Sequence, residues 1–133
     1  MSIEKSVRDV LLDVASVADE NISYGVVKES ATFPNITFEI ISKEPMSIGT
    51  DHLHKMVIEV RTADYNAQSV ATIYEQVEQA FENSIGETFD DYTFDVLINA
   101  SSIIQSPSIG PGDEAEPFVA TTVVEILYKY SVS

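Results

Sequence analysis

The chain has 133 residues, of which 44% are hydrophobic, and it carries a net charge of −15, from seven Lys and Arg against 22 Asp and Glu. This length suits one core, so we predict a single domain over residues 1–133. The hydrophobic content is too high for a disordered chain, and no apolar run is long enough to cross a membrane. The chain has no cysteine, which excludes disulfides and fits a reducing cytosol. The N-terminal residues lack the basic-then-apolar layout of a secretory signal, so none is expected.

The acidic residues are unevenly distributed. No Lys or Arg lies between Arg61 and Lys129, although that interval holds twelve acidic residues. Such a surface repels nucleic acid phosphates and anionic lipid. One interpretation of this acidic surface is a solvated face that keeps the protein soluble. The other is a functional surface, which either lies near DNA without binding it or meets a basic partner.

Hydrophobic spacing in the first half of the chain predicts one helix and two clear strands. Residues 3–18 place apolar side chains three and four apart, which is typical of an amphipathic helix. Ser23–Lys28 is short and β-prone, and it predicts an edge strand or an extended arm. Ile36–Lys43 and His54–Arg61 alternate between apolar and polar residues, as half-buried strands do. The turn residues within Glu44–Asp51 predict a hairpin loop, which would make these two strands antiparallel neighbours.

The second half predicts a helix, a strand, a long connection and a final strand. Asp64 and Asn66 are the two candidate N-caps for a helix over Asn66–Phe81. Asp91–Asn99 reads as a strand. Ser101–Pro117 holds three prolines and two glycines, so it predicts a long loop or a protruding hairpin arm. Phe118–Tyr130 alternates over its whole length and predicts a long strand. In the strand over Asp91–Asn99, alternation predicts that four side chains share one side: Tyr92, Phe94, Val96 and Ile98.

The resulting element order is α–(β)–β–β–α–β–β. It predicts an α+β fold with a mixed, mostly antiparallel sheet, two helices packed on one face and a long arm or loop before the last strand. The last strand has apolar residues on both faces, so helices on one side would leave Val119, Val123 and Leu127 uncovered. An exposed row of this kind usually marks an interface. The alternative is a second layer formed by the long loop itself.

The candidates for chemistry are weak. Asp51, His52 and His54 form the only histidine cluster, but two or three ligands make an incomplete metal site, and a polar hairpin tip is the simpler interpretation. The acidic pairs Asp90-Asp91 and Asp113-Glu114 fit solvated turns better than acid–base or calcium sites. Neither a nucleophile elbow nor a phosphate loop is present in the sequence. The sequence therefore predicts no enzyme activity, no cofactor and no metal site.

Several local sequences, taken in order, resemble a known family. A helix that opens the chain leads to Phe33-Pro34-Asn35-Ile36, then to a strand containing Val57–Arg61, and after Thr62–Tyr65 to the helix Asn66–Phe81. This arrangement is similar to the tail terminator (tail completion) proteins of long-tailed bacteriophages of the lambda type. The similarity covers most of the chain in element order. It depends on the proline before the second strand, the strand–Asx–helix junction and the long final strand.

The resemblance implies a structural role without catalysis. Such proteins form a hexameric ring that caps the tail tube and then docks to the head connector. The expected partners are therefore other copies of the chain, the tube protein and the connector protein, with DNA passing through the lumen unbound. The expected location is the virion, after assembly in the host cytoplasm. The loops Glu44–Leu53 and Ser101–Pro117 would be the contact arms, and a ring would bury the uncovered face of the last strand.

The residues expected in these contacts come from the two loops and the last strand. They are Pro45, Met46, Ile48, Asp51, His52, Ile103, Ile104, Pro107, Ile109, Pro111, Asp113, Glu114, Val119, Val123 and Leu127. Two alternatives stay open. One is a neighbouring neck or tube ring protein of the same virion. The other, of a different class, is a dimeric α+β binding module that holds a ligand or a basic protein.

Overall fold

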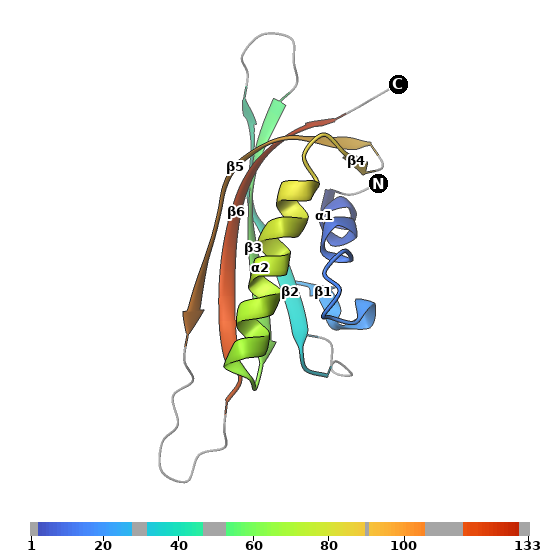
Figure 1. Cartoon of the computed structure of the whole chain (residues 1–133). Helices are drawn as coiled ribbons and strands as arrows, with labels where there is room; N and C mark the ends of the chain where they lie inside the picture. Colours follow the sequence, from blue (N-terminus) through green and yellow to red (C-terminus); the bar gives the residue numbers. More distant parts are fainter. Residues whose placement is uncertain (1–2, 28–31, 47–52, 90, 106–115, 131–133) are drawn as a thin grey trace.

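The computed structural model describes residues 3–27, 32–46, 53–89, 91–105 and 116–130 (Figure 1). The elements in chain order are α1 (Ile3–Leu11), a 3-10 turn (Asp19–Asn21), β1 (Ile22–Tyr24), β2 (Asn35–Met46), β3 (Leu53–Asp64), α2 (Ala67–Asn83), β4 (Thr88–Phe89), β5 (Tyr92–Gln105) and β6 (Phe118–Tyr130). The strands form one sheet in the order β1-β2-β3-β6-β5-β4. β1 is parallel to β2, and all other neighbours are antiparallel.

The predicted fold class is wrong, because the sheet dominates the structure. Of the described residues, 52% are in strands and 27% in helices, and the six strands curve into a half-barrel. Figure 1 shows α1 and α2 on the same side of the sheet, with the sheet bending around α2. The predicted order and the mostly antiparallel pairing agree with the structure only in part. One strand, β4, was missed, β2, β3 and β5 are longer than expected, and β1 is shorter than the predicted Ser23–Lys28.

A single core fills the space between the helices and the concave side of the sheet. Successive buried residues of β3 and β6 alternate with partly exposed ones, so each strand presents one row to the helices. α1 and α2 contribute residues three and four apart, as amphipathic helices do. The largest fully buried side chains are Phe38, Phe81, Phe94, Leu11, Ile22, Ile36, Met56, Ile58, Ile73 and Ile126.

Helix α2 begins where the sequence predicts. The Asn66 side chain accepts hydrogen bonds from the backbone N–H groups of Gln68 at 2.9 Å and Ser69 at 3.2 Å. These bonds satisfy two donors that have no partner inside the helix. The C-terminal cap is Ser84, and its hydroxyl donates to the carbonyl of Phe81 at 2.6 Å.

Helix α1 ends earlier than predicted. The expected helix over residues 3–18 stops at Leu11, and the chain continues in turns in which Asp13 and Val14 donate to carbonyls three residues back. Val14 and Val17 are nonetheless buried. The spacing of apolar residues therefore continues past the end of the helix, because the turns that follow it also direct side chains into the core. This is why the predicted helix was too long.

Strands β2 and β5 run further than predicted, and β4 was not predicted at all. β2 passes through Pro45, which was expected to mark a turn. Proline lacks a backbone N–H, so it is tolerated on an edge strand, and in the described chain β1 covers β2 only at Ile36–Phe38. β5 likewise continues through Ser101–Gln105, which was assigned to the long connection.

The predicted face of β5 is wrong as well. Register shifts lie between Phe94 and Val96 and between Leu97 and Asn99. Each shift inserts a residue that has no opposite partner, which moves the following side chains to the other face. Tyr92 and Phe94 therefore lie on the helix side of the sheet, whereas Val96 pairs with Leu127 on the open side.

Two buried threonines on the helix side give a matched test of hydroxyl burial. The Thr62 hydroxyl has no hydrogen-bond partner among the described residues, whereas the Thr122 hydroxyl lies 2.8 Å from that of Ser102. We expect Thr62→Val to raise the free energy of unfolding by about 1 kcal/mol, and Thr122→Val to lower it by a similar amount. Urea denaturation of both variants measures this. A stability loss in Thr62→Val equal to that in Thr122→Val would contradict the assignment.

Candidate functional site

The first candidate site is the face of the sheet that the helices leave uncovered. On β6, Val119, Val123 and Leu127 share this face and are partly exposed. Val57 of β3 lies in the neighbouring row, and Val96 of β5 pairs with Leu127. No element of the described chain packs over these residues. The structure thus brings together the three residues of the last strand that were expected to need a cover.

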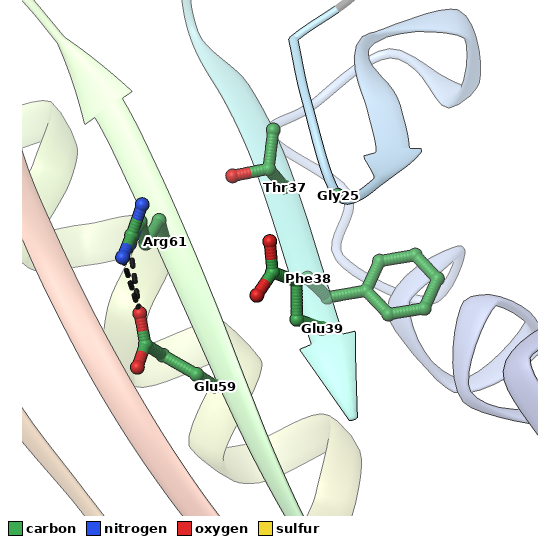
Figure 2. A pocket seen from close by; sticks show the side chains of 6 residues that line it. All are labelled: Gly25, Thr37, Phe38, Glu39, Glu59 and Arg61. Carbon is green, nitrogen blue, oxygen red and sulfur yellow. Dashed lines mark hydrogen bonds and ion pairs between the residues drawn. The ribbon is translucent and has the colours of Figure 1, made fainter. Parts of the chain in front are cut away.

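Charged residues interrupt the apolar part of this open face. Lys55 lies 3.9 Å from Glu125, and Arg61 lies 2.7 Å from Glu59. Figure 2 shows Arg61 and Glu59 facing each other on β3, with Glu39 on the adjacent β2. Glu39 and Glu59 are directly paired across the strands, so Arg61 offsets a like-charge contact. Solvent-exposed ion pairs of this kind contribute little to stability.

The hollow around Arg61 offers little space for a ligand. Between Gly25, Thr37 and Glu39 the cavity measures about 10 Å³, which is room for about one water molecule. Figure 2 shows the Phe38 ring pointing away from this hollow. A wider open groove of about 300 Å³ lies beside it and is lined by Val26, Val27 and Val119 among others. It extends the open face towards β1.

The second candidate site is the outer edge of β5. β4 pairs only with Tyr92 and Thr93, and Gly86 and Glu87 bond to Phe94. From Asp95 to Gln105 no described strand pairs with this edge. The ten residues from Val96 to Gln105 carry no charge. Ile103, one of the expected contact residues, is 72% exposed, and Ile104 is 39% exposed.

The other expected contact residues lie apart from these two surfaces or outside the description. Pro45 is exposed on β2 and pairs with His54, and Met46 pairs with Leu53. Ile48, Asp51, His52, Pro107, Ile109, Pro111, Asp113 and Glu114 lie outside the described residues. The sequence analysis did not include Val57 and Val96 among the contact residues, although both lie on the open face. Val57 could have been found from the sequence, because it alternates with the buried residues of its strand and so belongs to the open face. The place of Val96 could not, because the register shifts in β5 change which face its side chain lies on.

The predicted histidine cluster is only partly described. His54 stacks on Tyr128 with ring centroids 5.3 Å apart, while Asp51 and His52 fall outside the description. Within the described ranges, no group of three or more potential metal-ligating residues occurs. Among the described helices, none is long and apolar enough to cross a membrane.

An aromatic cluster closes one end of the sheet and is the third candidate site. Tyr92 lies 5.7 Å from Tyr128 and 5.2 Å from Tyr130, measured between ring centroids. These rings and His54 line a shallow pocket of about 280 Å³. Burial raises the pKa of Tyr128 above 10.0, and the neighbouring Tyr92 and Glu4 raise it further. Burial is also the largest cause that raises the pKa of Tyr92, followed by Tyr130, Asp91 and Glu4.

No protein-family model matches the chain, and a search of curated proteins gives no match.

The raised tyrosine pKa values predict a loss of stability in alkali. A group whose pKa is raised on folding stabilises the folded state below its unfolded pKa, and this contribution is lost as the pH rises through the folded value. The free energy of unfolding should therefore fall as the pH increases above 10.0. We expect Tyr128→Phe to reduce this fall, as measured by denaturation at about pH 9 and about pH 11.

The control for this experiment is Tyr65→Phe, which removes an exposed hydroxyl outside the cluster. It reports the effect of losing any tyrosine hydroxyl. An unchanged pH dependence in Tyr128→Phe would show that burial of this phenol does not determine alkaline stability.

Proposed function

We propose that this chain is a structural protein of a bacteriophage virion that assembles as a ring at the head–tail junction, in the role of the tail terminator. The observation that carries the proposal is the uncharged edge of β5 from Val96 to Gln105, which pairs with no described strand, in a chain whose net charge is −15. Natural proteins protect exposed edges with charge or proline. An edge of this length without either is suited to pairing with another chain.

We take the partner of β5 to be β2, at the other side of the described sheet; unlike the β5 edge, it carries charge and a proline, namely Glu39, Lys43, Glu44 and Pro45. In the described chain β1 covers only Ile36–Phe38 of β2, so the outer edge of β2 is unpaired from Glu39 to Met46. β2 and β5 run in opposite directions in the sheet. If neighbouring copies face the same way, β5 of one copy and β2 of the next therefore form an antiparallel pair, which extends the existing sheet.

This contact is heterologous, because the two surfaces differ, and heterologous contacts generate closed rings or open filaments. β1 covers the start of β2, and β4 covers the start of β5. Because β2 and β5 run in opposite directions, these two covered stretches lie at opposite ends of the sheet. Joining the free stretches therefore requires an offset between copies along the strand direction. A closed ring accommodates such an offset when its strands tilt from the ring axis, as they do in barrels.

The two hairpins suit a ring that contacts a different partner on each side. The pairs His54–Tyr128 and Ala63–Val119 mark opposite ends of the sheet. β2 ends and β3 begins at the first of these ends, with Met46 opposite Leu53, and β5 ends and β6 begins at the second, with Gln105 opposite Val119 (Figure 1). A tail terminator must meet the tail tube at one end and the head connector at the other. The six-fold ring remains an implication of the family resemblance.

The acidic surface is compatible with DNA passage. The solvent side of α2 carries Glu75, Glu78 and Glu82, and the helix has no basic residue. If this side lines the lumen, DNA phosphates are repelled and the DNA slides without binding. The open face, with Val123 and Leu127, would then lie away from the lumen.

The direct experiment is negative-stain imaging of the purified protein, alone and mixed with tail tubes. We expect rings that cap one end of each tube. Rings stacked along the tube would instead support a neighbouring neck or tube protein. A monomer in isolation does not contradict the proposal, because such subunits can wait for the tube. Absence of the protein from purified virions would contradict it.

Charge placed on each free edge tests the geometry of assembly. Ile103 of β5 and Ile41 of β2 are both exposed, so Ile103→Lys and Ile41→Lys should leave folding intact. We expect each variant to reduce capped tubes at least about ten-fold, because a desolvated lysine at the strand edge opposes pairing. Gln79→Lys, on the solvent side of α2, is the matched control and should cap tubes normally.

The same variants separate the ring from the second candidate function, a dimeric binding module. The free β5 edge favours this alternative too, since two copies can pair their β5 edges around a two-fold axis. In that case Ile103→Lys breaks the dimer, and Ile41→Lys has no effect. If neither variant changes assembly, the strand edges are not the contact, and both candidates lose their support.

A further inference from the structure

The aromatic pocket at the β2–β3 end of the sheet is not used by the proposed ring contact. It is lined by His54, Tyr92, Tyr128 and Tyr130, which come from three adjacent strands. Tyr92 and Tyr130 face each other across the β5–β6 pair, and His54 and Tyr128 across the β3–β6 pair. Four neighbouring rings thus line one shallow, open hollow beyond the end of the core.

We propose that this pocket binds an organic cation, an alkylammonium or guanidinium group. The faces of aromatic rings carry a negative quadrupole and attract a cation placed over them, and several rings around one space form the aromatic cages that recognise such groups. The volume of about 280 Å³ lies at the lower limit of small-molecule sites, so it suits a compact head group better than a large ligand.

The charges near the pocket favour a cation over an anion. Glu4 of α1 and Asp91 both act on Tyr92, and Glu4 also acts on Tyr128, which raises the pKa of both phenols. Glu4 also lies 3.8 Å from Lys43, and Lys129 stands between Tyr128 and Tyr130 in the sequence, so these carboxylates are partly offset. The chain as a whole is strongly negative, at −15, and this favours a cation over an anion.

The pocket is partly open, which allows a ligand to enter. Tyr128 is 5% exposed and forms the floor, whereas Tyr130 is 44% exposed and lies at the rim. A cation that enters exchanges part of its hydration for the ring faces, and such contacts strengthen as they become desolvated. The site does not depend on the proposed ring, so either can fail without the other.

Titration with tetramethylammonium chloride tests the proposal, using the NMR resonances of the tyrosine rings at constant ionic strength. We expect saturable shifts of the pocket tyrosines, with a dissociation constant on the order of ten millimolar. tert-Butanol, a neutral molecule of similar shape, should bind at least about five-fold more weakly. Equal binding of the two probes, or no shift with tetramethylammonium, would overturn the proposal.

Variants at the rim test which ring carries the attraction. Tyr130→Leu should weaken tetramethylammonium binding about five-fold, whereas Tyr130→Phe, which keeps the aromatic face, should retain it. Tyr65→Leu is the matched control, because Tyr65 is similarly exposed but lies outside the pocket. Circular dichroism of each variant verifies folding. Equal binding by Tyr130→Leu and the parent protein would overturn the cage.

Two further probes identify the source of the cation. N-acetyl-arginine amide and N-acetyl-lysine amide present the side chains of a protein partner, whereas tetramethylammonium represents a free quaternary ammonium compound. Tighter binding of either amide assigns the pocket to a basic side chain of a partner, and tighter binding of tetramethylammonium assigns it to a small molecule. Both results support the cation site.

Discussion

The rest of the structure depends on the packing of α2 into the concave side of the sheet. Ile73, Val77 and Phe81 are fully buried, and they belong to the same core cluster as the inward rows of the central strands. A sheet that surrounds one helix must curve, and β-bulges are the usual means of bending a strand. The register shifts in β2 and β5, the strands that flank the central pair, are consistent with this demand. The half-barrel is thus a consequence of covering one helix with many strands.

A core on one side of a sheet leaves a second face without cover. Both helices lie on the concave side, and the structure describes no element that packs against Val123, Val57 and Leu127. The protein reduces the resulting apolar exposure by placing ion pairs such as Lys55–Glu125 among these residues. The edge of β5 has no such protection from Val96 onward. The open face is therefore partly adapted to water, whereas the β5 edge is not, and this difference makes the edge the stronger candidate for assembly.

The sequence predicts those elements whose pattern is uninterrupted. β6 spans Phe118–Tyr130 as expected, because its alternation runs unbroken, and α2 begins after the Asn66 cap. The β5 face could not be predicted, because two register shifts change its period and nothing in the local sequence marks them. The predicted end of α1 was too late in the chain, because Val14 and Val17 are buried at helical spacing although they lie beyond the helix. The aromatic pocket was missed for a related reason, since its four rings come from strands that become neighbours only in the folded sheet.

The net charge of −15 bears on when such a protein could assemble. Like-charged copies repel each other, and at physiological ionic strength this repulsion extends over a screening length of about 8 Å. Copies that pair β5 with β2 also bring acidic surfaces such as the solvent side of α2 close to one another. Spontaneous ring formation is therefore opposed by electrostatics and favoured by strand pairing and apolar burial. A template that holds subunits side by side raises their effective concentration and shifts this balance towards the ring. Under the proposed function, a strongly acidic subunit whose β5 edge pairs with no described strand is thus suited to assembling on the end of a finished tube while remaining dispersed before the tube is complete.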